Sequence, residues 1–179
     1  MFERTGHSTL RGPAPATLQR GDRLNLGGGA TISVLWPPPN CPMNSANSGL
    51  VLRLNYAGRS ILFPSDIGEP AELALLNDPQ SLRCDVLVAP HNGSTERSTA
   101  AFLHAADLKF IVCSSDRTLT QKQVQFDEIA KDWPVYRTGT CGAIEVNFSA
   151  GGNVSIAAYD GLKVEGTPVA SNGTNRPRN

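Results

Sequence analysis

The spacing of apolar residues changes near residue 65, and this change constrains the fold more than any other feature of the sequence. Over residues 50–56, apolar and polar side chains alternate, which is the period of a strand with one buried face. Between residues 69 and 131, helical spacing replaces the alternation and is interrupted by two short, continuous apolar runs. Strand-like segments return after residue 134. The chain is therefore predicted to contain strands, then alternating helices and strands, then strands again.

Turn and cap signals set the boundaries of these elements. Three prolines at positions 37–39 end the first predicted strand, and the Ala-Gly-Arg sequence at 57–59 marks a tight turn. Pro70 suits the first turn of a helix. The glycines at 27–29 predict a turn and not a phosphate loop, because no Lys-Ser/Thr pair and no helix follows. The predicted strands are 31–36, 50–56, 60–63, 85–89, 109–113, 135–136, 143–148 and 154–158, and the predicted helices are 69–76, 98–106 and 121–131.

This order of elements predicts an α/β or α+β domain in which helices cover a mixed sheet. With 179 residues, the chain is long enough for one domain and not comfortably for two. A flexible segment is expected over residues 1–20, the folded domain over 21–160 and a disordered tail over 161–179, because the two ends carry few residues that a core would bury.

The charge and apolar content exclude several classes of protein. The chain has 16 basic and 16 acidic side chains, and neither half is basic or acidic, which argues against a polybasic nucleic-acid arm or membrane patch. No apolar run approaches the roughly 18–20 residues of a membrane span. The N-terminus lacks the basic and apolar regions of a signal peptide. We therefore expect a cytoplasmic chain without a transmembrane segment.

Metal-binding side chains are scarce. The three histidines are His7, His91 and His104, whereas a dinuclear metal site built mainly on imidazoles needs about four or five. The four cysteines are widely spaced and form no C-x-x-C pair, so neither a zinc ribbon nor a redox dithiol is predicted. Cys84 and Cys113 border or lie in apolar runs and are expected to be buried free thiols.

Two polar side chains follow neighbouring predicted strands. Asp66 comes just after the third predicted strand and His91 just after the fourth. Because ligands in open sheets bind beyond the carboxyl ends of strands, we expect the two side chains to converge. Their oxygen and nitrogen atoms are ligands that zinc or manganese accepts. Gly93 would allow a close backbone approach, and Ser94 a helix cap. In the alternative interpretation, Asp66 caps the next helix and His91 is an ordinary turn residue.

Several segments, in their order and spacing, resemble the metallo-β-lactamase-fold domain at the C-terminus of ComEC-type DNA-uptake proteins. The family reads N-S-L-V-L-R-L, T-G-D-I, A-D-V-L-K-V-P-H-H-G-S and V-Y-R-T…G-A-I. This chain reads N-S-G-L-V-L-R-L, P-S-D-I, C-D-V-L-V-A-P-H-N-G-S and V-Y-R-T…G-A-I. The resemblance spans residues 20–150 and is carried by residues 21–38, 47–54, 58–67, 85–94, 135–138 and 142–144.

The resemblance implies a partial metallo-β-lactamase-like domain, the second half of an αββα sandwich whose metal site lies at the edge between two similar halves. It implies metal-dependent phosphodiester hydrolysis, with DNA as the family's substrate. In the family, this domain is attached to a membrane protein. Asp66 matches the family's metal-side Asp, and His91 matches the first His of H-H-G-S. The implied cofactor is a divalent ion, zinc or manganese, and the residues implied to line the site are Ser65, Asn92, Gly93 and Ser94.

The sequence also departs from the family pattern. The H-x-H-x-D-H signature of the family's first half does not occur, Ser65 replaces a Gly, and Asn92 replaces the second His. Hydrolysis is therefore expected only if a partner supplies the missing ligands. Three explanations are open: a truncated or split product, a degenerate descendant, or a half completed by another chain, either an N-terminal half-domain or a second copy. The alternative function is a non-catalytic binding or structural module without a metal site.

Half a sandwich would also expose the sheet face that its missing half covers. We therefore expect the chain to dimerise or to be poorly soluble. Val51, on the opposite side of its strand from Leu50 and Leu52, is expected to help line the exposed face.

Overall fold

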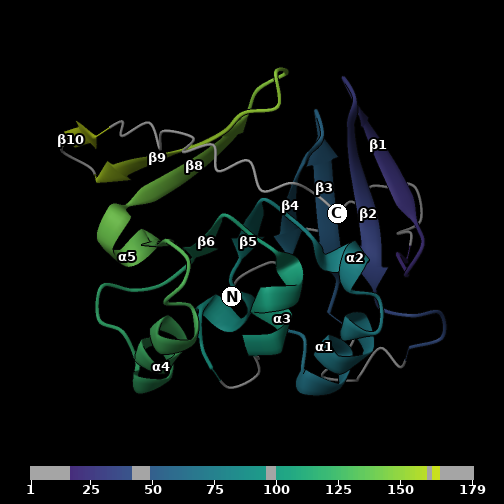
Figure 1. Cartoon of the computed structure of the whole chain (residues 1–179), viewed down its shortest axis with the longest axis horizontal. Coiled ribbons are helices and arrows are strands. Elements are labelled where there is room, and N and C mark those ends of the chain that lie inside the picture. Colours follow the sequence, from purple (N-terminus) through teal and green to yellow (C-terminus); the bar gives the residue numbers. More distant parts are fainter. Residues whose placement is uncertain (1–16, 42–48, 96–99, 161–162, 166–179) are drawn as a thin grey trace, which may run out of the picture.

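The computed structural model describes residues 17–41, 49–95, 100–160 and 163–165. Most of the expected flexible segment 1–20 and most of the expected tail 161–179 therefore lie outside the described residues. Within these ranges, the chain forms a layer of helices, a seven-stranded sheet and a three-stranded sheet (Figure 1). The protein is thus of mixed α/β type and contains a mixed sheet, as the order of elements predicted.

The seven-stranded sheet is antiparallel at one end and parallel at the other. Its first four strands form a meander, and the strands from the fourth to the seventh run parallel to one another. The last three strands are short and mainly apolar, because layers cover both of their faces. In spatial order, the strands are β1 (Arg23–Gly27), β2 (Ala30–Trp36), β3 (Val51–Tyr56), β4 (Arg59–Phe63), β5 (Val86–Val88), β6 (Phe110–Cys113) and β7 (Val135–Arg137).

Four helices cover one face of this sheet (Figure 1). They are α1 (Glu69–Leu76), α2 (Pro79–Leu82), α3 (Ala100–Ala106) and α4 (Gln121–Ile129). Fully buried apolar side chains from the helices and from the sheet form the main core, among them Leu62, Leu87, Phe102, Ile111 and Phe126. This core holds the carboxyl ends of β4, β5 and β6 in fixed positions.

The last strands form a separate sheet on the opposite face. After β7, the chain turns through α5 (Thr138–Cys141) and Gly142, whose φ of 69° is a glycine conformation. This turn takes the chain out of the large sheet, so the prediction of one mixed sheet holds for the strand at 135–136 and is wrong for those at 143–148 and 154–158. The small sheet consists of β8 (Ala143–Phe148), β9 (Val154–Asp160) and β10 (Lys163–Glu165), and it packs Ile156 against Ile61, Val86 and Phe110.

The small sheet leaves part of the large sheet uncovered. Leu50, Leu52, Leu54 and Phe63 lie on this part and line a groove. Val51 points the other way, into the core beneath the helices, and is fully buried. The expectation that Val51 lines the exposed face is therefore wrong, because the helices cover the side of β3 that carries it.

The predicted elements are present, with boundaries that agree within a few residues. The strand β1, the helices α2 and α5, and β10 were not predicted, because each is short and none carries a long apolar period. The strand β10 lies inside the expected tail. None of the helices in the described ranges has both the length and the apolar character that crossing a lipid bilayer requires.

Candidate functional site

Asp66 and His91 lie together at one edge of the large sheet. Asp66 is in the turn between β4 and α1, and His91 is in the single 3-10 turn η1 (Pro90–Asn92) that follows β5. Because β4 and β5 are adjacent and parallel, both turns leave the sheet at the same edge. His91 Nδ1 is 3.7 Å from Asp66 Oδ1. The two side chains therefore converge, as the strand order predicted.

A backbone hydrogen bond fixes the orientation of the His91 ring. Its Nε2 donates to the carbonyl oxygen of Ile67 at 2.8 Å. Since a carbonyl only accepts, Nε2 carries a proton in this bond, and Nδ1 is the ring nitrogen that faces Asp66. The His91 side chain is 18% exposed and that of Asp66 76% exposed. A ring held through one nitrogen, with the other nitrogen open beside a carboxylate, is the arrangement by which proteins orient a metal-binding histidine.

The backbone at the site is left-handed in both turns. The φ angles are 57° at Ser65, 48° at His91, 54° at Asn92 and 69° at Gly93. Three of these residues are not glycine, and such strained residues cluster at functional turns. A Cβ atom on Gly93 would stand 2.8 Å from the Sγ atom of Cys113, so the backbone approaches its neighbour as closely as expected for a glycine at this position.

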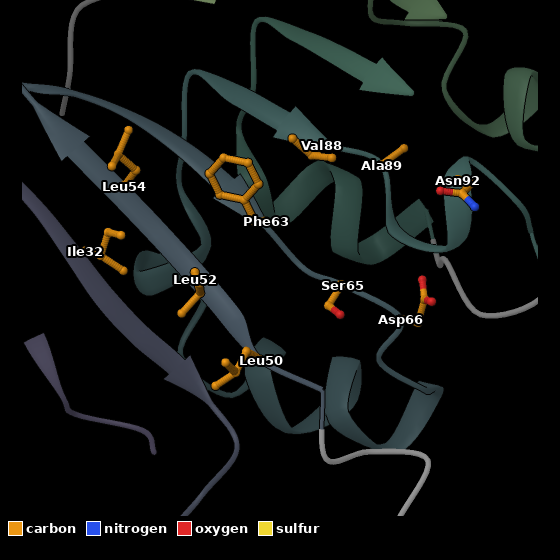
Figure 2. Close-up of a pocket in the computed structure, with 10 residues that line it drawn as sticks. All are labelled: Ile32, Leu50, Leu52, Leu54, Phe63, Ser65, Asp66, Val88, Ala89 and Asn92. Carbon is orange, nitrogen blue, oxygen red and sulfur yellow. The ribbon is translucent and has the colours of Figure 1, made fainter. Parts of the chain in front are cut away.

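Two cavities adjoin the His91 turn. An apolar groove of about 590 Å³ crosses the uncovered face of the large sheet, and Ser65, Asp66 and Asn92 form its polar end (Figure 2). A polar cleft of about 740 Å³ lies on the other side of the turn. His91, Asn92 and Ser94 line it together with Ser114, Ser115, Asp116, Thr118, Thr120, Gln121, Lys122 and Gln123. The side chain of Asn92 thus borders both cavities.

The donor set fits one side of a metal site. Asp66 and His91 offer an oxygen and a nitrogen, whereas tetrahedral zinc takes four ligands. In the part of the chain that the structure describes, no group of three or more His, Cys, Asp or Glu side chains is placed to hold a metal ion. At the position of the family's second His, Asn92 offers a neutral amide. Among the described residues, Asp66 and His91 therefore bring two potential ligand atoms together.

The structure bears on the alternative interpretation, in which Asp66 caps the next helix. The residue at the N-cap of α1 is Gly68, and no side-chain hydrogen bond caps this helix. Asp66 is therefore not the helix cap of the alternative interpretation. The predicted cap by Ser94 involves residues 96–99, which lie outside the described ranges, as does His7. His104 is exposed on α3 and contacts Trp133 edge-on at 5.0 Å, as expected for a histidine outside the site.

All four cysteines are free thiols. Cys84 and Cys113 are buried, as the sequence predicted, and Cys41 and Cys141 are partly exposed. Burial raises the pKa of the Cys84 thiol to about 12 and that of Cys113 to about 11. Both thiols therefore stay protonated at neutral pH.

The sequence did not indicate two residues, Gln123 and Arg137, that contact the His91 turn from neighbouring elements. Gln123 donates from Nε2 to the carbonyl oxygen of Asn92 at 3.0 Å. Arg137 is buried, and its guanidinium lies against Gly93. The Thr-x-x-Gln pattern at 120–123 is a capping-box signal that marks the start of α4, but nothing in the sequence indicates that the same Gln side chain also reaches the His91 turn.

A comparison of the chain with protein-family models and with curated proteins finds no match.

Proposed function

We propose that this chain is one half of a metal-dependent phosphodiesterase of the ComEC-like metallo-β-lactamase fold, and that it does not hydrolyse its substrate alone. The observation that carries the proposal is the pair formed by Asp66 and His91 at adjacent strand ends, with 3.7 Å between Oδ1 and Nδ1. Both residues are at positions that match metal-side residues of the family motifs. The order of those motifs along the chain supports the same assignment.

The two residues would hold the ion from one side. His91 keeps the proton on Nε2 through the bond to Ile67, which leaves Nδ1 able to donate its lone pair. Asp66 is exposed enough for both carboxylate oxygens to be reached. When bound, a zinc or manganese ion lowers the pKa of water and neutralises charge on a phosphodiester. The ligands still missing are those of the H-x-H-x-D-H motif, and a partner half would supply them.

The uncovered sheet face supports the presence of such a partner. It is apolar over Leu50, Leu52, Leu54 and Phe63, and its polar end is the candidate site itself. A complementary half that covered this face would bury exposed apolar surface, which is favourable. The same contact would bring its own ligands to Asp66 at the polar end of the groove, next to His91.

Reconstitution of DNA cleavage tests the proposal. The purified chain is assayed on labelled DNA with zinc or manganese, alone and mixed with the H-x-H-x-D-H half of a ComEC-type protein expressed as a separate chain. We expect no cleavage alone and cleavage in the mixture. Asp66→Ala and His91→Ala should abolish it, whereas His104→Ala, a matched change outside the site, should not. Cleavage by the chain alone, lost on Asp66→Ala, would overturn the proposal.

The second candidate function is a non-catalytic binding or structural module. The observation that favours it is the pair of replacements at the site itself, where Ser65 and Asn92 stand in place of a glycine and a ligand. In this case the mixture would show no cleavage under any metal condition, and Asp66 and His91 would have a structural role only.

A further inference from the structure

We propose that Gln123 and Arg137 are positioning residues that hold the His91 turn in its left-handed conformation and so set where His91 lies relative to Asp66. The functional meaning of this support rests on the function proposed above. Its existence can be tested without metal, partner or substrate.

The His91 turn needs support because its backbone is unfavourable. Three consecutive residues, His91, Asn92 and Gly93, have φ angles of 48°, 54° and 69°. Residues other than glycine rarely adopt this conformation, and hardly ever in a row. Two local hydrogen bonds, from Gly93 N to Pro90 O at 3.0 Å and from Ser94 N to His91 O at 3.1 Å, close the turn. The rest of its stability must come from contacts with other elements.

Gln123 provides one such contact from α4. Its Nε2 donates to Asn92 O at 3.0 Å, while its Oε1 accepts from Thr120 N at 3.0 Å. The same side-chain amide therefore caps α4 and forms a hydrogen bond to the middle residue of the His91 turn. Gln123 is buried, so this bond is shielded from competition with water.

Arg137 provides a second contact, from the end of β7. Its side chain is 6% exposed, and its Nη2 pairs with Asp127 Oδ1 and donates to Gln123 O at 3.4 Å. The guanidinium fills the space beneath Gly93, where an added Cβ would stand 3.1 Å from Nη1. Arg137, the last residue of β7, thus connects this strand to α4 and to the His91 turn.

These contacts leave the turn little freedom to move. The bond from the His91 ring to Ile67 O attaches it to the loop before α1. Gln123 attaches it to α4, whose Phe126 is fully buried in the core. Because the candidate ligand His91 lies between these attachments, a loss of the Gln123 contact should displace its ring.

The variant Gln123→Glu separates the support from the helix cap. Glutamate retains a side-chain acceptor oxygen, which a capping box requires at this position. It has no N–H to donate, and it places an acceptor against the carbonyl of Asn92. The matched control is Gln125→Glu on the same helix. There the Oε1 atom accepts from Thr95 Oγ1 at 3.2 Å, a bond that a carboxylate preserves.

Hydrogen exchange and NMR of the full chain read out the effect. In Gln123→Glu, the amides of Gly93 and Ser94 should exchange about tenfold faster, which corresponds to the loss of one net hydrogen bond. The ring signals of His91 should shift, while the amide of Ala130, bonded to Phe126 O, should keep its protection. Gln125→Glu should behave like the unmodified chain. Arg137→Lys should also speed exchange at the amide of Gly93, because lysine lacks the planar guanidinium group that packs against Gly93.

Two results would overturn the proposal. The first is unchanged exchange at Gly93 and Ser94 together with unmoved His91 ring signals. The second is a loss of protection throughout α4, which would mean that Gln123 acts only as a helix cap. Neither result bears on reconstituted cleavage, and a failure of reconstitution would leave these exchange rates unaffected.

Discussion

Ser65 and His91 both hold left-handed backbone at the two turns that form the candidate site. At His91 the conformation directs the ring toward Asp66, and neighbouring elements hold it in place. Ser65 directly precedes Asp66. Its left-handed conformation is one that a glycine adopts without steric cost.

Ser65→Gly should therefore stabilise the chain. Removing the left-handed penalty outweighs the extra entropy of glycine in the unfolded chain, for a net gain of about 0.5–1 kcal/mol. Urea unfolding measures this change. Ser155→Gly, in the exposed row of β9, is the matched control and should destabilise by a similar amount. A loss of stability in Ser65→Gly would contradict the account of this turn.

The buried thiols predict a fall in stability at alkaline pH. Burial raises the pKa of Cys84 and Cys113 to about 12 and about 11, from the ordinary value of 9.0. Above pH 9 the unfolded chain therefore releases these protons before the folded chain does, and the free energy of unfolding falls as pH rises toward the folded values. Between pH 8 and 10 the loss should total about 1–3 kcal/mol. The double variant Cys84→Ala, Cys113→Ala should show a smaller loss, and an equal loss would refute this assignment.

Among the elements, the start of β5 is tied to its neighbours by one carboxylate. Asp85 lies 3.1 Å from both Arg59 Nη1 and Lys109 Nζ, and it accepts from Ser60 N at 2.9 Å. Arg59 in turn donates to the carbonyl of Gly152 in the turn between β8 and β9. This cluster therefore connects the large sheet to the small one.

Asp85→Asn should weaken that connection. The Asp85 side chain is 13% exposed, so its loss of charge leaves two cations facing a neutral amide, at a cost of about 1–2 kcal/mol. Asp107→Asn removes a carboxylate that is 73% exposed and 3.9 Å from Arg83, and should change stability by less than about 0.5 kcal/mol. Thermal unfolding of the two variants compares these costs. Equal shifts in the two variants would contradict the proposed role of Asp85.

The sequence predicted the elements whose apolar residues follow a clear period. It did not predict the features that depend on contacts between residues far apart in the chain. The alternation in 50–56 and the apolar run before Pro90 were enough to place Asp66 and His91 at neighbouring strand ends. The departure of β8 from the large sheet depends on Gly142 and α5, and no period reveals it. The support from Gln123 and Arg137 is likewise a long-range contact, since Gln123 and Asn92 are 31 positions apart in the sequence. Which face of β3 is covered depends on where the helices pack, and this misled the expectation for Val51.

At the scale of the whole molecule, the uncovered sheet face predicts self-association. Leu50 is 36% exposed and Phe63 39% exposed on this face. Light scattering of the purified chain should show dimers or larger species that grow with concentration. The double variant Leu50→Ser, Phe63→Ser should shift the chain toward monomer. Leu73→Ser, at a position 53% exposed on α1, should not. A chain that stays monomeric at high concentration would count against a missing partner surface.

The claim that Asp66 and His91 form half of a metal site is tested most directly by a calorimetric zinc titration. The chain is titrated alone and in the presence of the H-x-H-x-D-H half. With two ligands, the chain alone is predicted to bind zinc weakly, and the mixture is predicted to bind it tightly and stoichiometrically. Asp66→Ala and His91→Ala should each abolish the tight binding. Tight stoichiometric binding by the chain alone, or tight binding by the mixture that survives both substitutions, would contradict the claim.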